Sequence, residues 1–235
     1  MPNKESAERM SGHLPNLFSS YWNRMKFREE FHLISKIPCY RWYWDDEFNE
    51  VEKIVWETTK SDQSILDFGS GDNRLRNKFL GQSFSGEYKT FDLSQEYPHD
   101  FATIEEISGQ FDSIFLFEVI EHMDLDTFSS TIAGLERCLK PRGKFIISTP
   151  NPACIYPMWA RDMTHIQQYP QQDLWTYFRA LGYSCQIFRV VFLPKKQKIL
   201  DNLRFLMKRA ICYVLGVDYA DGSLLVAKKE SKAEN

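Results

Sequence analysis

The stretch from Ser64 to Asn73 constrains the fold more than any other part of this sequence. Its first half, Ser-Ile-Leu-Asp-Phe, reads as a short buried strand that carries one carboxylate, Asp67. Gly69, Ser70 and Gly71 then form a tight loop, and the apolar spacing after Asn73 predicts the start of a helix. Two glycines between a strand and a helix let a ligand approach the backbone closely, and the helix N-terminus offers free N–H groups there. This arrangement indicates a site for a nucleotide-like cofactor.

The loop differs from a dinucleotide fingerprint, because a pyrophosphate site would have a third glycine where this chain has Arg74. Asp67 stands two residues before the first glycine, which suits a cationic ligand better than a phosphate. A second predicted strand, Tyr88 to Leu93, contains Asp92 at its end, 21 residues beyond Gly71. An acid at this distance in a βαβ nucleotide site reaches the ribose hydroxyls. We therefore assign Asp92 and the adjacent Leu93 to the cofactor site; a solvated aspartate at a strand end is the alternative for Asp92.

Strands and helices alternate along the rest of the chain. The apolar run Phe111 to Phe117, followed by Glu118, is typical of a central parallel strand buried on both faces. Further strands are expected at 144–149, 183–193 and 222–228, with helices at 125–139, 172–181 and 195–215. A weak third strand or an adenine-contacting loop is expected at 99–102, where Phe101 would face the adenine. The pattern predicts a doubly wound, Rossmann-like α/β sheet whose site lies at the carboxyl ends of its strands.

The N-terminal part is helical in pattern from Leu17 to about Lys60 and unusually aromatic, with the run Tyr40 to Trp44 at its centre. It is either a lid that stacks aromatic side chains over the cofactor or an acceptor, or a helix pair that packs on the sheet. We divide the chain into a helical cap at 1–60 that is part of the same domain, a catalytic domain at 61–229 and a tail at 230–235.

Composition narrows the class of protein. The net charge of −3 gives no general attraction to nucleic acid, and no apolar run approaches the length that spans a bilayer. The five cysteines are scattered without metal-like or disulfide-like spacing, and the N-terminus is polar without an apolar core. A soluble, cytoplasmic protein is the expectation.

Four ordered motifs resemble those of the class I S-adenosylmethionine-dependent methyltransferases. They are Asp67-Phe-Gly-Ser-Gly71, Glu118-Val-Ile-Glu-His122, Leu139-Lys-Pro-Arg-Gly143 and Ile147-Ser-Thr-Pro-Asn151. The motifs are similar to those of a large branch of this class, which includes the ubiquinone-pathway O-methyltransferases and the small-RNA 3′-terminal 2′-O-methyltransferases. The family often has a third glycine where this chain has Asn73, a residue that tolerates left-handed backbone. The resemblance implies a seven-stranded, mostly parallel sheet with an antiparallel last strand, and S-adenosylmethionine bound by Asp67, Gly69, Ser70, Gly71, Asp92, Leu93, Phe101 and Glu118.

Glu118, Glu121, His122 and His165 form the constellation that carries chemistry. A turn after the central strand would bring Glu121 and His122 back toward Glu118, and His165 follows the next strand. Two carboxylates and two imidazoles are suitable ligands for a divalent ion, and in the resembling RNA enzymes the corresponding residues hold Mg²⁺ or Mn²⁺. Without a metal, His122 or His165 would act as the general base beside Glu118. In a structural alternative, the histidine packs under the cofactor and the glutamate caps the next helix.

The expected function is O-methylation, an EC 2.1.1 type of reaction, of a small-molecule, lipid or glycan acceptor. No Asn-Pro-Pro-Tyr type motif for amino-group methylation is present. The alternatives are a metal-dependent RNA 2′-O-methyltransferase and a non-catalytic cofactor-binding or scaffold protein. The basic segment from Lys195 to Arg209 would contact RNA, an anionic membrane or a phosphorylated acceptor, or it is an ordinary solvated helix face. The sequence leaves the acceptor, the methylated atom and the oligomeric state open.

Overall fold

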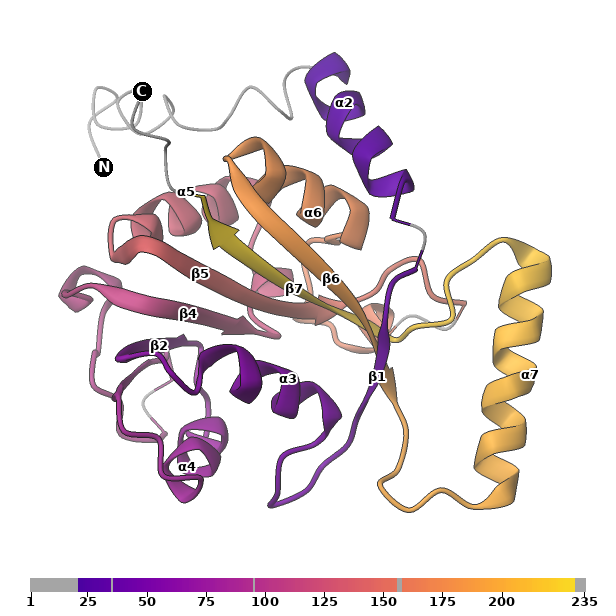
Figure 1. The fold of residues 1–235 in the computed structure, drawn as a ribbon, viewed down its shortest axis with the longest axis horizontal. Coiled ribbons are helices and arrows are strands. Elements are labelled where there is room, and N and C mark those ends of the chain that lie inside the picture. The colour runs from indigo at the N-terminus through magenta and orange to yellow at the C-terminus, as the bar shows by residue number, and fades with distance from the viewer. Residues whose placement is uncertain (1–20, 35, 95, 156–157, 231–235) are drawn as a thin grey trace.

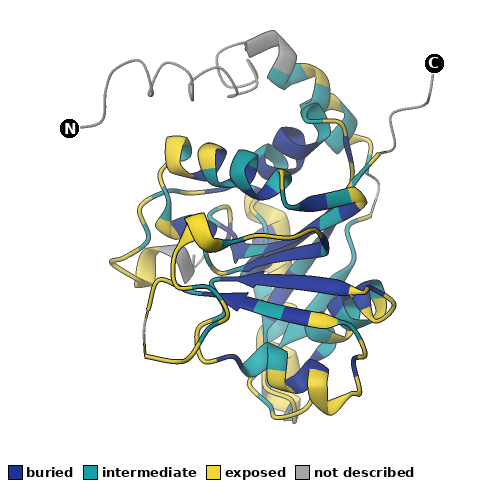
Figure 2. Ribbon diagram, turned by 90° about the vertical axis from the view of Figure 1, so that its left-hand side faces the viewer, coloured by how far each residue is buried: buried dark blue, intermediate teal, exposed yellow. Residues whose placement is uncertain are grey.

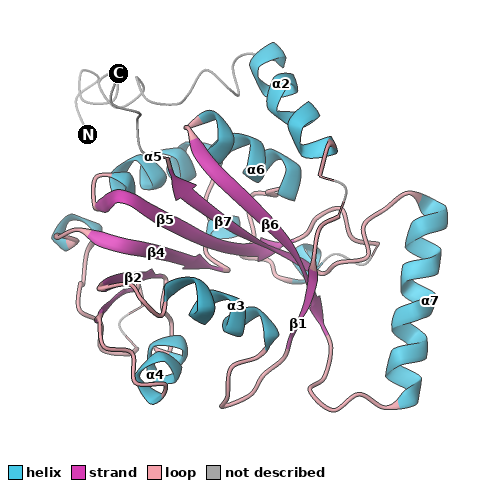
Figure 3. Ribbon diagram, viewed as in Figure 1, coloured by secondary structure: helices cyan, strands magenta, loops and turns pink. Residues whose placement is uncertain are grey.

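A seven-stranded sheet runs through the centre of the molecule (Figures 1 and 3), in the order β1-β6-β7-β5-β4-β2-β3. The computed structural model describes residues 21–34, 36–94, 96–155 and 158–230. The strands are β1 (Cys39–Trp42), β2 (Ser64–Phe68), β3 (Glu87–Phe91), β4 (Phe111–Phe117), β5 (Leu139–Pro150), β6 (Tyr183–Phe192) and β7 (Gly222–Lys229). β7 pairs antiparallel with β5 and β6, and all other pairs are parallel. The predicted Rossmann-like sheet with an antiparallel last strand is confirmed.

Helices cover both faces of the sheet. The helices of the described residues are α2 (Tyr21–His32), α3 (Glu50–Thr59), α4 (Arg74–Gly81), α5 (Leu125–Glu136), α6 (Gln171–Ala180) and α7 (Ile199–Leu215), of which α7 lies outside the two layers (Figure 1); the short 3₁₀ turns are η2 (Ile104–Glu106), η3 (Ile120–His122) and η4 (Met158–Arg161). Alternate strand residues point to opposite faces, so Leu66 packs with α5 and α6 while Ile65 packs with α3 and α4. Figure 2 shows the resulting buried strands between more exposed helices. The carboxyl ends of β2 and β4 therefore meet at one edge.

The N-terminal segment departs from the predicted helix. Tyr40, Arg41 and Trp42 lie in β1, an edge strand that pairs in parallel with β6. The helical prediction for Tyr40 to Trp44 was therefore wrong, because strand pairing with a segment far along the chain decides the conformation. Within the predicted helical segment, α2 and α3 are helices: Phe27 and Phe31 of α2 pack on the core, and Phe31 meets Trp175 of α6 edge to face at 5.7 Å. These two aromatics have the packing role rather than the lid role.

The expected third strand after β3 is absent as an element from the described residues. Its place is taken by a single bridge between Phe91 and Phe101. The backbone N–H of Thr90, which a neighbouring strand would use, donates instead to the Asp100 carboxylate at 3.0 Å. Because this N–H is already hydrogen-bonded, it cannot pair with a further strand next to β3. The seventh strand of the sheet is β1, at the opposite edge.

Helix α7 lies beyond the β1 edge of the sheet, apart from the two layers (Figure 1). It begins at Ile199 rather than at the predicted Lys195. Asp201 accepts the backbone N–H of Lys198 at 3.0 Å and so fixes this later start. Among the described residues, no helix combines the length and the apolar character needed to cross a membrane.

Candidate active site

A cleft of about 840 Å³ opens at the carboxyl edge of the parallel strands. One wall is the loop between β2 and α4, with Gly69, Ser70 and Gly71. The floor is formed by the strand ends that carry Glu118 after β4 and Ser148 in β5. The other wall is aromatic and comes from β1, the segment after it, and the end of β6: Trp42, Tyr43, Trp44, Phe192, Leu193, Pro194 and Lys195. A cleft of this volume is in the upper part of the usual range for small-molecule sites.

The glycine loop has a backbone that only small residues adopt comfortably. Gly69 has φ +84° and Gly71 φ +51°. A Cβ atom on Gly69 would lie 2.3 Å from Cγ2 of Val119, whereas a Cβ on Gly71 would meet nothing within 4 Å. The N–H groups of Gly69 and Ser70 both donate to the Phe91 carbonyl, at 2.7 and 3.1 Å, which ties the loop to β3. The loop is thus rigid on its inner side and open on the cleft side.

Asn73 occupies the position at which the related family has its third glycine. Its φ is +60°, in the left-handed region, and it precedes the first residue of α4. Its side-chain amide donates to the Pro98 carbonyl at 3.0 Å. An asparagine therefore replaces the glycine here without a change of backbone region.

Two aspartates surround the glycine loop in different environments. Asp67 is buried and accepts a hydrogen bond from the Tyr88 hydroxyl at 2.8 Å; burial raises the pKa of Asp67 to about 7 against the effect of that bond. Asp92 accepts the N–H of Gly71 at 2.8 Å and that of Ser94 at 2.8 Å, so this carboxylate lies directly on the loop. The spacing that suggested a common site for Asp92 and the loop therefore corresponds to a contact in the structure.

The other predicted cofactor residues lie at different distances from the cleft. Glu118 lines the cleft, has φ +54°, and accepts a hydrogen bond from the Ser148 hydroxyl at 2.7 Å. Leu93 follows Asp92 and is 79% exposed, and Phe101 is partly buried against the core. Neither Leu93 nor Phe101 lines the cleft; both lie next to β3, on the Asp92 side of the loop.

Glu121, His122 and His165 form a cluster beside Glu118. One potential ligand atom from each lies within 4.8 Å of the others, and the two imidazole rings are 4.9 Å apart. The 3₁₀ turn η3 carries Glu121 and His122 back from the strand end. The loop with His165 is attached to this turn, because Ile166 N–H donates to the Glu121 carbonyl at 2.9 Å. The structure therefore brings three of the four predicted metal ligands together. Glu118 lies beside them: its carboxylate accepts a hydrogen bond from Ser148 and interacts electrostatically with Glu121.

The donor set of this cluster fits a divalent metal. Glu121 is fully buried; its Oε2 accepts from the Thr149 hydroxyl at 3.0 Å, and its Oε1 has no hydrogen-bond partner among the described residues. Burial, and next the charge of Glu118, raise the pKa of Glu121 to about 8. His122 Nδ1 lies 3.2 Å from the Thr164 carbonyl, which can only accept, so Nδ1 carries the proton and Nε2 is left as a ligand atom. Two imidazoles and a carboxylate suit Mn²⁺ better than Mg²⁺, which prefers oxygen ligands.

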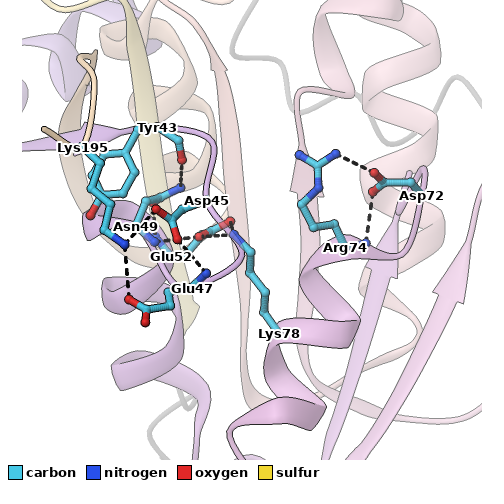
Figure 4. Close-up of polar contacts among 9 residues, drawn as sticks. All are labelled: Tyr43, Asp45, Glu47, Asn49, Glu52, Asp72, Arg74, Lys78 and Lys195. Atoms are coloured by element: carbon cyan, nitrogen blue, oxygen red, sulfur yellow. Dashed lines mark hydrogen bonds and ion pairs between the residues drawn. The ribbon is translucent and has the colours of Figure 1, made fainter.

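Ion pairs hold the aromatic wall in place (Figure 4). Lys195 contacts the carboxylates of Asp45 at 2.8 Å and Glu47 at 3.4 Å, and so joins the end of β6 to the segment after β1. The Arg74 guanidinium lies 4.2 Å from the centre of the Trp44 ring and pairs with Asp72 at 2.6 Å. The segment is further fixed where Asn49 caps α3 and where Lys78 of α4 pairs with Glu52 at 2.8 Å.

Sequence reasoning missed several residues of this site. Tyr88, Ser148 and Arg74 were not assigned to the site, although Ser148 is near the carboxyl end of a predicted strand, the usual place for site residues. The contacts of Tyr88 with Asp67 and of Arg74 with Trp44 join different elements. No local pattern marks such contacts.

A family model described as a methyltransferase domain matches residues 41–186, more than half of the chain. The chain belongs to the methyltransferase domain family. The predicted class I S-adenosylmethionine-dependent methyltransferase is confirmed at the level of family and fold, and the branch within the class stays a prediction.

Solved structures with the same fold include several methyltransferases. An S-adenosylmethionine-dependent methyltransferase from Archaeoglobus fulgidus is 15% identical, with 89% of this chain and 100% of that chain covered and a TM-score of 0.58. The 1,6-didemethyltoxoflavin N1-methyltransferase of Burkholderia thailandensis is 14% identical, with 98% and 91% covered and a TM-score of 0.53. The methyltransferase domain of bacterial CtHen1-CN is 14% identical, with 77% and 96% covered and a TM-score of 0.50. A comparison with curated protein sequences gives no significant match.

Proposed function

We propose that this methyltransferase transfers a methyl group from S-adenosylmethionine to a hydroxyl oxygen of a small-molecule, lipid or glycan acceptor. The observation that carries the proposal is the cleft with two unlike walls. The glycine loop and its carboxylates form one wall, and the aromatic side chains of β1 and β6 form the other. A cofactor and an acceptor that share this cleft would lie next to each other, which is the main requirement of a methyl transfer in line with the leaving sulfur.

The loop side fits S-adenosylmethionine. Gly69, Ser70 and Gly71 leave room for close approach to the backbone, and the Glu118 carboxylate would attract a cationic ligand. The positive charge of such a ligand would favour the ionised form of Asp67, which lies under the loop. Asp92, on the loop, would bind the ribose, with Leu93 and Phe101 on the adenine side. When bound, S-adenosylmethionine supplies a methyl group already activated by the sulfonium. The protein itself has to bind the cofactor and the acceptor, orient them, and remove a proton from the acceptor hydroxyl.

The imidazoles of His122 and His165, which lie beside Glu118 rather than in the lining of the cleft itself, would accept that proton. An acceptor hydroxyl loses its proton as its oxygen attacks, and an imidazole accepts a proton near neutral pH. His122 Nδ1 donates to the Thr164 carbonyl, so Nε2 is the basic nitrogen. Glu118, at the floor of the cleft, would orient the acceptor or the cofactor through its carboxylate, whose Oε1 also accepts from the Ser148 hydroxyl.

A divalent metal would be held by Glu121, His122 and His165, with Glu118 beside them. It would polarise the acceptor oxygen and lower the pKa of the hydroxyl. The orphaned buried oxygen of Glu121 supports this addition to the proposal, because a buried polar atom without a hydrogen bond is costly unless a ligand satisfies it. We expect Mn²⁺, because it accepts imidazole ligands more readily than Mg²⁺ does.

The same cluster favours a second candidate function, metal-dependent 2′-O-methylation of RNA. The resemblance of Glu118-Val-Ile-Glu-His122 to the RNA branch supports it. The net charge of the chain disfavours it, because 29 basic and 32 acidic residues give no excess of positive charge to bind RNA phosphates. Methylation of a nitrogen is a further outcome to test, because the fold is shared with an N1-methyltransferase.

Calorimetric titration of the purified protein with S-adenosylmethionine, with and without Mn²⁺, tests the cofactor and metal sites. Binding in the micromolar range is expected, and Asp92→Ala should weaken it strongly, whereas His165→Ala should leave it unchanged. Transfer of a labelled methyl group into lipid, small-molecule and RNA fractions, followed by mass spectrometry of the product, then identifies the acceptor class. An N-methylated product, or label in RNA alone, would overturn the primary proposal; no cofactor binding at all would favour the scaffold alternative.

A further inference from the structure

Helix α7 contacts the rest of the protein along only one side. Lys208 pairs with Asp221 at 2.6 Å, Cys212 is buried, and Phe205 lies 6.0 Å from the Tyr219 ring. These three contacting residues of α7 are three or four positions apart, which places them on one stripe of a helix. The opposite side of the helix faces away from the sheet (Figure 1).

The outward side of α7 is apolar. At about 100° per residue, an arc centred near Leu203 holds an unbroken set of apolar side chains. Its members include Ile199, Leu203, Leu206, Met207, Ile211 and Val214, with exposed fractions from 47% for Ile211 to 90% for Ile199. The described part of the chain leaves this face uncovered. An exposed apolar surface of this extent on one element marks an interaction site rather than ordinary scatter.

Basic residues border the apolar face. Arg204 and Arg209 lie on its two flanks, about 100° and about 120° from its centre, and Lys196 and Lys198 precede the helix. Asp201 is the one acidic residue within α7, and it is engaged with the Lys198 backbone N–H at 3.0 Å. The whole chain has a net charge of −3, but α7 and the residues before it are locally cationic. This local positive charge would attract an anionic surface.

We propose that α7 lies in the surface of a membrane with anionic lipid headgroups. The apolar face would enter the boundary of the acyl chains, and Arg204 and Arg209 would remain at the level of the phosphates. A helix of 17 residues with charged flanks suits this position in the plane of the interface. This inference concerns a partner of the protein and does not rest on the proposed methyl acceptor.

Self-association through the same face is less suited to these residues. Two copies that bury the apolar faces against each other would bring the arginines of both helices together. The flanks carry no acidic residue that would compensate, so like charges would meet at the rim of the interface. An anionic lipid surface supplies the missing negative charge.

Vesicle flotation with the full chain tests the proposal. The probes are vesicles of phosphatidylcholine alone and vesicles of equal parts phosphatidylcholine and phosphatidylglycerol. The protein should float with the anionic vesicles, less with the neutral ones, and less as salt increases. Leu203→Glu combined with Leu206→Glu should reduce binding at least about tenfold, and Arg204→Gln about fivefold. Leu33→Glu, a matched change at a leucine that is 82% exposed near α2, should bind like the wild type.

Equal flotation of the wild type and the double variant, or no flotation of the wild type, would overturn the proposal. If the wild type does not bind vesicles but forms a dimer in analytical ultracentrifugation, and the double variant is a monomer, the apolar face would be assigned to a second copy instead. Circular dichroism and calorimetric titration with S-adenosylmethionine show whether each variant is folded. Since α7 lines none of the cleft, these readouts also separate a failure of the membrane inference from a failure of the proposed function.

Discussion

Asp67 should make the protein less stable as the pH rises through neutrality. Its side chain is 3% exposed, and burial, opposed by the Tyr88 hydrogen bond, raises its pKa from 3.8 to about 7. Each pKa unit corresponds to about 1.4 kcal/mol, so ionising the buried group costs the folded state about 4 kcal/mol relative to the unfolded chain. The folded pKa is the higher one, so this stability is fully present below pH 3.8 and is lost as the pH rises through about 7.

Asp67→Asn removes this pH dependence while it keeps an acceptor for the Tyr88 hydroxyl. Urea denaturation of wild type and variant at a series of pH values gives the free energy of unfolding of each. Between about pH 5 and about pH 8.5 the wild type should lose about 3 kcal/mol that the variant does not lose. The difference between the two proteins isolates Asp67, because other titrating groups contribute to both.

Asp112→Asn is the matched control. Burial would raise the pKa of Asp112, but Lys140 and hydrogen bonds from Gln63 and Ser64 outweigh it and hold the pKa below 3.8. The stability that Asp112 contributes is therefore lost only at acid pH, and its variant should differ from the wild type by a constant amount above about pH 5. A pH-independent difference for Asp67→Asn as well would refute the argument that a buried, protonated carboxyl lies under the glycine loop.

Three further predictions concern the candidate site. Gly69→Ala should weaken S-adenosylmethionine binding at least about tenfold, because φ +84° disfavours a side chain and the new Cβ meets Val119 at 2.3 Å. Adding Val119→Ala should restore part of the affinity in the same titration. No recovery would show that the contact with Val119 does not cause the loss of affinity. His165→Ala should lower kcat about 10²-fold or more without a change in cofactor affinity, and full activity would remove His165 from the acceptor side. Glu121→Gln should weaken Mn²⁺ binding at least about tenfold in calorimetry, and equal affinity in both proteins would place the ion elsewhere.

The sequence predicted the central strands well because their signals are local. The apolar run Phe111 to Phe117 and the glycines after Phe68 each identify a buried strand or its end without knowledge of the neighbours. β1 could not be predicted in this way. Its residues Cys-Tyr-Arg-Trp fit a helix or a strand, and the pairing of Trp42 with Phe192, which lies far along the chain, decides between them.

The site residues likewise divide into those marked by local sequence patterns and those whose positions depend on contacts with distant parts of the chain. Asp92 was placed at the glycine loop from spacing alone, and Glu121, His122 and His165 from the expected return of the chain after two strands. The position of Glu118 relative to this cluster depends on its own left-handed backbone and on the Ser148 hydroxyl. The buried state of Asp67 depends on Tyr88 in the adjacent strand. Side-chain partners of this kind follow from sheet register, which a single sequence leaves undetermined.

The connection between β6 and α7 relates the cleft to the proposed membrane surface. Leu193, Pro194 and Lys195 line the cleft, and α7 begins four residues after Lys195, at Ile199. Four residues of extended chain span at most about 14 Å, so the wall of the cleft stays close to whatever α7 binds. The ion pairs of Lys195 with Asp45 and Glu47 hold this end of the connection against the aromatic wall. An acceptor with an apolar tail anchored in the bilayer gains from this short distance, whereas a freely diffusing metabolite does not. If α7 binds anionic vesicles, the lipid class therefore becomes the first of the three acceptor classes to test.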